Sequence, residues 1–322
     1  MRDKIKLIHK GDLQMKKAFF YIDDVIWVLR DLTRNRPASI FDHPFLNMLK
    51  TAYEKYGVKT KLNLFYRTDY FYGYDEFSLE DMTDAYRTEW EANSHFLKLS
   101  FHAKHEFPDY PHVNAKYEDI KSLFKDTERE VIRFAGKNSF SYSITPHWLP
   151  MSKAGVQALY DCGAKILDCT VGDDVREYNG DSSSLPYGHE FRLLHNRQPE
   201  TKVFTRPDRD PAIANSICAY NHLTTDIPAA LANNLEYHID KETGMAFKKF
   251  GPFCLNVTPF EEIEPRLTTY LGNEYVGVMD HEQYFYEDYF NYQPDYADKI
   301  FKMGEMLKEK GYEFFFIEEI VK

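Results

Sequence analysis

The sequence KAFFYIDDV, residues 17–25, joins an apolar run of strand length directly to two carboxylates. Six further apolar runs of similar length follow, and helical patterns that end at glycines, such as those over 44–56 and 296–307, separate several of them. The predicted strands are 17–22, 61–66, 96–101, 139–144, 164–169, 275–279 and 312–317. Because strands that alternate with helices pair in parallel, this pattern predicts an α/β fold and one barrel-like sheet.

Residues 171–274 interrupt the alternation of strands and helices. They are rich in Asp, Asn, Pro and Arg and contain only short strand-like pieces. We therefore expect a single domain over residues 1–322, in which 171–274 is a long insertion before the last strands that decorates one end of the barrel.

The composition of the chain excludes several classes of protein. Aromatic residues make up 16% of the 322 residues, which argues against disorder and indicates a sizeable core. No apolar run approaches the roughly 18 residues of a membrane span, and a formal charge of -11 argues against nucleic-acid binding. The four cysteines form no C-x-x-C pair and no apolar signal stretch opens the chain. We expect a cytoplasmic protein, or a secreted or periplasmic one if a leader precedes this sequence.

Polar, histidine and tryptophan side chains follow the predicted strands at their carboxyl ends, where α/β barrels carry their chemistry. These residues are Asp23, Asp24, Arg67, His102, His105, Glu106, His147, Trp148, Asp168, Asp280, His281, Glu282, Glu318 and Glu319. Imidazole nitrogens and carboxylate oxygens are the ligands that Zn²⁺ and similar divalent metals take. The sequence therefore predicts a divalent metal site at one end of the barrel.

Four of these segments resemble motifs of the polysaccharide deacetylases, the NodB-like proteins of carbohydrate esterase family 4. YIDDV (21–25) is similar to the family's T-F-D-D-G, with valine in place of glycine, and FHAKHE (101–106) is similar to H-[ST]-x-x-H. MDHEQ (279–283) resembles the motif that holds a late histidine, and TPHW (145–148) lies where the family has R-P-P-[YF]. The resemblance implies a distorted (β/α)₇ barrel.

The resemblance also implies a role for each matching side chain. Asp23 would be the general base, and Asp24 and His102 would be metal ligands. His281 would be the general acid, and Trp148 would line the sugar pocket.

The sequence departs from the family motifs at the third ligand and at one arginine. The second motif has its second histidine at His105, three residues after the first, and a glutamate at the next position. The third ligand is therefore His105, our first assignment, or Glu106, or His147 from the following strand, and the residues that do not ligate would face the substrate. The arginine that orients the base is absent from TPHW, so Arg67 is the expected substitute.

The function that the resemblance implies is metal-dependent hydrolysis of N- or O-acetyl groups on a polysaccharide or oligosaccharide. The expected cofactor is Zn²⁺, with Co²⁺, Ni²⁺ or Mn²⁺ as alternatives, and the expected partner is a carbohydrate. Two other functions stay open. One is a glycoside hydrolase with Asp23 and Glu106 as its two carboxylates, and the other is a carbohydrate-binding protein that has lost catalysis.

Overall fold

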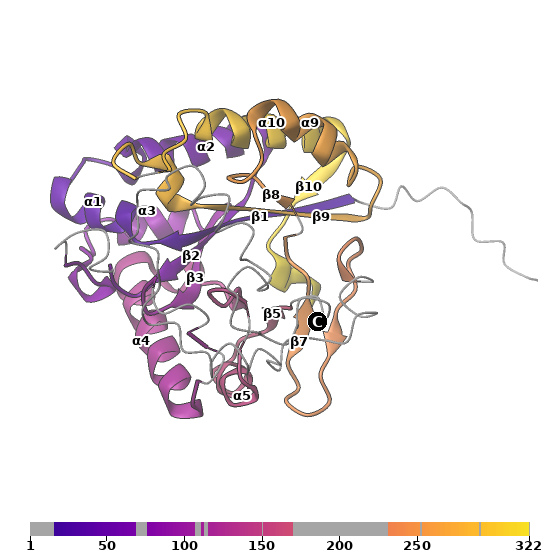
Figure 1. The fold of residues 1–322 in the computed structure, drawn as a ribbon. Helices are drawn as coiled ribbons and strands as arrows, with labels where there is room; N and C mark the ends of the chain where they lie inside the picture. Colours follow the sequence, from indigo (N-terminus) through magenta and orange to yellow (C-terminus); the bar gives the residue numbers. More distant parts are fainter. Residues whose placement is uncertain are drawn as a thin grey trace, which may run out of the picture.

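The computed structural model describes residues 16–68, 76–106, 111–112, 115–149, 151–169, 231–251, 253–289 and 291–321. Residues 171–230, which make up most of the predicted insertion, lie outside these ranges. The described part is a mixed α/β fold with two mainly parallel sheets and helices around them (Figure 1). Within the described ranges, no helix has the length and apolar character needed to cross a lipid bilayer.

The larger sheet is parallel throughout and has the order β3-β2-β1-β9-β8, with β10 paired to the start of β1. Its strands are β1 (Lys16–Val25), β2 (Thr60–Phe65), β3 (Leu97–Ala103), β8 (Phe253–Cys254), β9 (Tyr275–His281) and β10 (Tyr312–Phe314). Because the strands are parallel, the carboxyl ends of β1, β2, β3 and β9 meet at one edge of this sheet.

A second, smaller sheet has the order β4-β5-β7-β6, in which β6 alone is antiparallel to its neighbour. Its strands are β4 (Ser143–Ile144), β5 (Ile166–Asp168), β6 (His238–Ile239) and β7 (Ala246–Lys248). The seven predicted strands are therefore divided between two sheets, and the prediction of one sheet is corrected. A single bridge between Leu99 and Phe140 links β3 to the chain before β4.

The structure also shortens three predicted strands and adds two strands that were not predicted. The strand predicted over 139–144 shrinks to β4 because a 3₁₀-helix, η4 (Lys137–Ser139), occupies its start. The strand predicted over 164–169 shortens to β5, and the strand predicted over 312–317 ends at Phe314. β6, β7 and β8 lie inside 171–274, the predicted insertion. β6 and β7 were not predicted and join the smaller sheet, and β8 falls within the strand-like piece 252–257 and joins the larger sheet.

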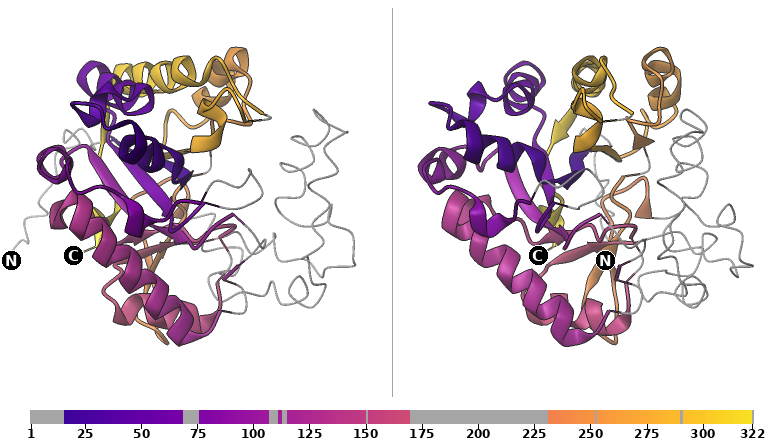
Figure 2. Two further views of the ribbon diagram at one scale, coloured as in Figure 1. Left: turned by 90° about the vertical axis from the view of Figure 1, so that its left-hand side faces the viewer. Right: turned by 60° about the vertical axis from the view of Figure 1, so that its left-hand side comes forward.

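Helices cover the outer sides of the two sheets. The α-helices are α1 (Trp27–Asn35), α2 (Pro44–Tyr56), α3 (Arg87–Ala92), α4 (Tyr117–Ala135), α5 (Lys153–Asp161), α9 (Phe260–Thr268) and α10 (Tyr296–Glu309). Further 3₁₀-helices are η1 (Ile40–Asp42), η3 (Leu79–Asp81), η8 (Glu282–Phe285) and η9 (Ile317–Ile320). In Figures 1 and 2, α2, α9 and α10 lie at the top of the molecule, and α4 and α5 lie at the bottom.

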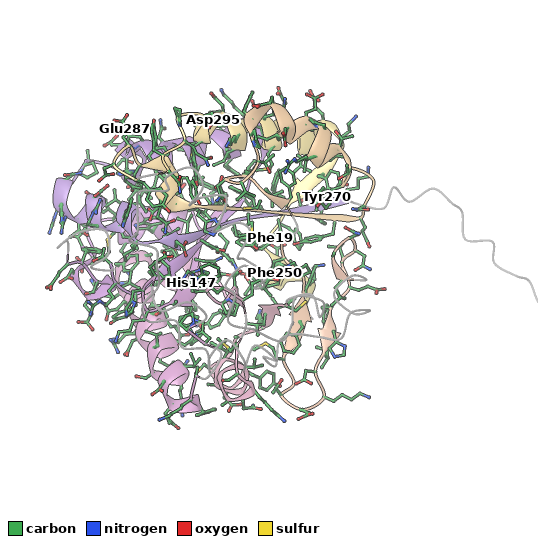
Figure 3. All side chains as sticks on the ribbon, in the orientation of Figure 1. Phe19, His147, Phe250, Tyr270, Glu287 and Asp295 are labelled. Carbon is green, nitrogen blue, oxygen red and sulfur yellow. The ribbon has the colours of Figure 1, made fainter. Side chains whose placement is uncertain are left out.

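β1 separates two apolar cores because its successive side chains point to opposite faces. Phe20 belongs to the larger core, which the helices cover. Phe19 and Tyr21 belong to a smaller core on the other face, together with Phe250. The rings of Phe19 and Phe250 meet edge to face with their centroids 5.7 Å apart (Figure 3). The smaller core therefore joins β1 to the chain that follows β7.

Buried polar contacts cross from the larger sheet to the smaller one. Tyr21 donates a hydrogen bond to Asp168 Oδ2 at 3.4 Å, and Lys61 Nζ donates one to the carbonyl oxygen of Ser143 at 3.1 Å. Asp168 Oδ1 also accepts the N–H of Phe250 at 2.9 Å. The described strands therefore face one another across a partly polar interior, as is consistent with a barrel-like fold.

The burial of Asp168 gives the first testable prediction. Burial raises the pKa of this carboxyl from 3.8 to about 6, although Lys249 and the Phe250 N–H act in the opposite direction. A carboxyl with a raised folded-state pKa stabilises the protein below its unfolded-state pKa, and this stabilisation is lost as the pH rises through about 6. The wild-type protein should lose about 2 kcal/mol of unfolding free energy from this group between pH 4.5 and 8.

The matched variant is Asp168→Asn, which keeps an acceptor for the Phe250 N–H and cannot ionise. Urea unfolding of both proteins at pH 4.5 and 8 measures the difference. Between pH 4.5 and 8, the unfolding free energy of Asp168→Asn should rise by about 2 kcal/mol relative to that of the wild type. A difference between the two proteins that does not change with pH would show that Asp168 ionises as readily in the folded chain as in the unfolded one.

Candidate metal centre

The end of β1 departs from regular strand geometry. Its register with β2 shifts between Ile22 and Val25, and Asp24 has a φ of 62°. A regular strand would point Asp23 and Asp24 to opposite faces, and a bulge with a left-handed residue, which Asp tolerates better than most, removes that constraint. Asp23 Oδ1 lies 4.0 Å from His102 Nδ1, and Asp24 Oδ1 lies 3.2 Å from His102 Nε2. The two adjacent carboxylates therefore flank one imidazole.

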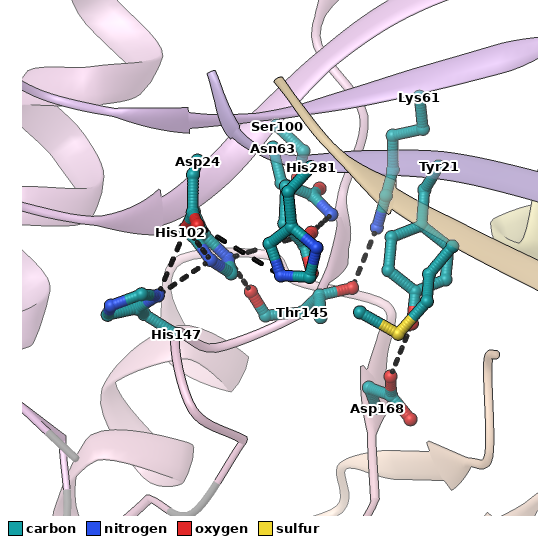
Figure 4. Close-up of polar contacts among 12 residues, drawn as sticks. Tyr21, Asp24, Lys61, Asn63, Ser100, His102, Thr145, His147, Asp168 and His281 are labelled. Carbon is teal, nitrogen blue, oxygen red and sulfur yellow. Dashed lines mark hydrogen bonds and ion pairs between the residues drawn. The ribbon is translucent and has the colours of Figure 1, made fainter. Parts of the chain in front are cut away.

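Asp24, His102 and His147 form a buried group of three donors near the ends of β1, β3 and β4 (Figure 4). Asp24 Oδ1 lies 3.2 Å from both His102 Nε2 and His147 Nδ1, and these two nitrogens lie 3.1 Å from each other. Ligands placed tetrahedrally at about 2.0–2.1 Å from a zinc ion are about 3.3 Å apart. The three donor atoms therefore have nearly the spacing of ligands that share one cation.

Each histidine of the group is oriented through its other ring nitrogen. His102 Nδ1 lies 2.6 Å from the carbonyl oxygen of Thr145, and His147 Nε2 lies 2.9 Å from that of Glu106. A carbonyl oxygen only accepts hydrogen bonds, so these nitrogens carry protons, and in the neutral form of the two rings the lone pairs of the other nitrogens face each other. Such lone pairs repel unless a cation or a proton lies between them. Metal-ligating histidines are anchored in this way.

Asp24 completes the case that these donors suit a metal ion. It is buried, and its Oδ1 has no hydrogen-bond partner among the described residues. Burial alone would raise its pKa, but His147, His102 and His281 together lower the pKa well below its usual range. Asp24 is therefore ionised at neutral pH. Two neutral imidazoles and one carboxylate are a donor set that Zn²⁺ and related metals accept.

Two further side chains of the predicted site stand beside this group. Asp23 Oδ1 accepts a hydrogen bond from Asn63 Nδ2 at 2.6 Å, and both residues are buried. His281 Nε2 lies 4.0 Å from Asp24 Oδ2, and its Nδ1 lies 3.0 Å from Asn256 Oδ1. A carboxylate and an imidazole, each held by an amide, therefore adjoin the three donors. Figure 4 labels Asn63 and His281 beside this group.

The structure distinguishes among the three residues considered for the third ligand. Among the described residues, the group of close donors contains His147 and does not contain His105. Glu106 contacts His147 through its backbone carbonyl, and its Oε1 lies 4.0 Å from His147 Nε2. The geometry therefore favours His147 over our first assignment, His105.

Trp148 and Arg67 occupy different positions relative to the donor group. Trp148 follows His147 directly, has a φ of 59°, and its ring centroid lies 5.9 Å from that of His147. The Arg67 Nε lies 3.5 Å from the carbonyl oxygen of Thr68. The hydrogen bond to Asp23 that we expected from Arg67 is made by Asn63.

Sequence analysis missed the two amides that hold Asp23 and His281. Asn63 lies within the apolar run 61–66, and Asn256 lies within the strand-like piece 252–257. An isolated amide inside an apolar strand was the available signal, because a buried polar side chain requires a partner.

Comparison with known proteins adds information on the fold. No protein-family model matches the chain, and no curated protein matches its sequence. The structure is similar to that of a 4-alpha-glucanotransferase from Thermococcus litoralis, with a TM-score of 0.51 and 11% identity over 95% of this chain. The chain spans about two fifths of that enzyme, because the match covers 40% of it. This likeness shows a shared fold.

A second solved structure is a family 4 acetyl xylan esterase from Clostridium thermocellum, in complex with a cobalt ion. The match covers 95% of this chain and 90% of the esterase, with 11% identity and a TM-score of 0.40. That TM-score is too low to establish a shared fold.

Proposed function

We propose that this protein is a metal-dependent hydrolase that removes acetyl groups from a carbohydrate. The observation that carries the proposal is the set of Asp24, His102 and His147 donor atoms, 3.1–3.2 Å apart, with Asp23 and His281 beside it. Zn²⁺ is the metal that this donor set suits best, and Co²⁺, Ni²⁺ and Mn²⁺ are alternatives. When bound, such an ion would act as a Lewis acid that polarises an acyl oxygen and lowers the pKa of a water molecule.

Asp23 has the position of a general base in this reaction. Asn63 holds one oxygen of its carboxylate, which fixes the orientation of the group. The Asp23 carboxylate accepts a proton from the water that attacks the acetyl carbon. A positioned base of this kind contributes typically 10²–10⁴-fold to a rate.

His281 has the position of a general acid. Asn256 Oδ1 accepts the proton on His281 Nδ1, so the other ring nitrogen, Nε2, is turned toward Asp24 and the donor group. When both ring nitrogens are protonated, Nε2 can donate a proton to the departing nitrogen or oxygen of the sugar. His281 therefore complements Asp23, which takes up a proton in the same reaction.

The position of Trp148 supports a carbohydrate substrate. Trp148 presents a large ring beside His147, and aromatic rings stack well on the apolar faces of sugars. The acyl group is the reacting part, and the sugar would be the part that such a ring contacts.

Acetate release from acetylated xylan and from N-acetylated chitooligosaccharides tests this function. We expect acetate from at least one of these substrates, loss of release with a chelator, and recovery with added Zn²⁺. New reducing ends without acetate, in the presence of chelator, would instead indicate a glycoside hydrolase. Oligosaccharide binding without either product would indicate a protein that has lost catalysis.

A further inference from the structure

The carboxylate of Glu282 joins the two sides of the proposed active site. Glu282 directly follows His281 at the end of β9 and is fully buried. Its Oε2 accepts the backbone N–H groups of Ile26 and Trp27, both at 2.8 Å, and its Oε1 accepts that of Val28 at 2.7 Å. One side chain next to the proposed acid thus binds three consecutive amides just after Asp24.

These three amides open helix α1. The first N–H groups of a helix have no partner within the helix, and the N-cap residue Ile26 provides no side-chain cap. Glu282 supplies the missing acceptors from another element, and its negative charge favours the positive end of the helix. The carboxylate therefore holds the start of α1 against the end of β9.

The held amides begin two residues after the left-handed residue Asp24. A non-glycine residue in this conformation persists where surrounding contacts over-determine the backbone. The bulge between Ile22 and Val25 is the feature that brings Asp23 and Asp24 to one place. Glu282 fixes the chain on the far side of that bulge.

We propose that Glu282 is a positioning residue, which sets Asp23 and Asp24 in place relative to His281 and so tunes metal binding. This inference rests on the proposed function. A helix cap with no such role would affect the stability of the protein and leave the metal site unchanged.

Glu89 on α3 offers a matched control. Its Oε2 accepts the backbone N–H of Ile40 at 2.9 Å, and its Oε1 accepts a hydrogen bond from the Ser39 hydroxyl. Glu89 therefore caps η1 from another element, as Glu282 caps α1. The metal donors are not among these partners.

The experiment compares Glu282→Gln with Glu89→Gln. Glutamine has the size of glutamate, but its NH₂ group cannot accept a hydrogen bond. At least one of the three hydrogen bonds from the backbone N–H groups is therefore lost. Burial raises the pKa of Glu282 to about 7, so work at pH 8.5 keeps the wild-type side chain ionised. The measurements are Zn²⁺ affinity by chelator competition, the Co²⁺ absorption spectrum, the unfolding midpoint, kcat and KM.

Glu282→Gln should bind Zn²⁺ about 10–100-fold more weakly, as outer-shell changes do, shift the Co²⁺ bands, and lower kcat with little change in KM. Glu89→Gln should lower the unfolding midpoint and leave the metal readouts as in the wild type. Glu282→Asp, which keeps the charge but shortens its reach, should have an intermediate effect and replaces Glu282→Gln if that variant does not fold.

Two outcomes distinguish a failure of this inference from a failure of the proposed function on which it rests. If the wild-type protein binds Zn²⁺, and a folded Glu282→Gln or Glu282→Asp variant binds it with equal affinity and gives the same Co²⁺ spectrum, the role of Glu282 is overturned. The proposed function is not affected by that result. A wild-type protein that binds no Zn²⁺ overturns both the proposed function and this inference.

Discussion

Replacement of Asp24 by glycine should lower Zn²⁺ affinity by at least about 10²-fold and abolish hydrolysis, because a direct ligand should matter at least as much as outer-shell partners do. Glycine adopts a φ of 62° without strain, so the turn at the end of β1 should persist while the carboxylate is lost. Chelator competition measures the affinity, and acetate release measures the activity. An unfolding midpoint near that of the wild type will show that the fold is retained.

Two histidine variants provide the matched comparison for the third ligand. His147→Gln should lose Zn²⁺ as Asp24→Gly does, because His147 Nδ1 lies 3.2 Å from Asp24 Oδ1. His105→Gln should retain the metal. The reverse pattern would assign the third ligand to His105 and would mean that the loop after β3 rearranges when metal binds.

Replacement of Asp23 by asparagine should lower the hydrolysis rate by about 10²–10⁴-fold and leave Zn²⁺ affinity nearly unchanged. Asparagine keeps the shape of the side chain, and its amide oxygen can still accept the hydrogen bond from Asn63. It cannot accept a proton from water. Metal content and single-turnover acetate release of the same preparation measure the two effects separately.

Loss of Zn²⁺ by Asp23→Asn, to the degree shown by Asp24→Gly, would make Asp23 a ligand and leave the base unassigned. His281→Gln provides an independent check on the pair of roles. Its rate should fall strongly on sugar acetates and amides, and far less on an aryl acetate, whose leaving group needs no proton. Equal losses on both substrates would remove the general-acid role.

Much of the fold could be predicted because long apolar runs carry a clear period. β1, β2, β3 and β9 lie where the sequence predicts strands, and α2 ends at Tyr56 with Gly57 as its cap, as the helical pattern over 44–56 predicts. β6 and β7 could not be predicted, because no apolar run of strand length marks their two and three residues. The place of β7 in the smaller sheet depends on β5, which lies far away in the sequence.

The candidate site could be predicted in part from the residues at strand ends. Asp24 and His102 come together because β1 and β3 end at the same edge of one parallel sheet. The contact of His147 with them depends on the path of the chain after β4, and local sequence does not specify that path. The role of Asn63 depends on the bulge at Asp24, which turns Asp23 toward β2.

The central claim is that Asp24, His102 and His147 hold the metal ion on which hydrolysis depends. Titration of the metal-free protein with Zn²⁺, followed by acetate release from an acetylated oligosaccharide, tests it most directly. We predict that activity is absent without metal, rises in proportion to added Zn²⁺, and reaches a plateau at one equivalent. Acetate release at full rate by the metal-free protein, unchanged by added Zn²⁺, would contradict the claim.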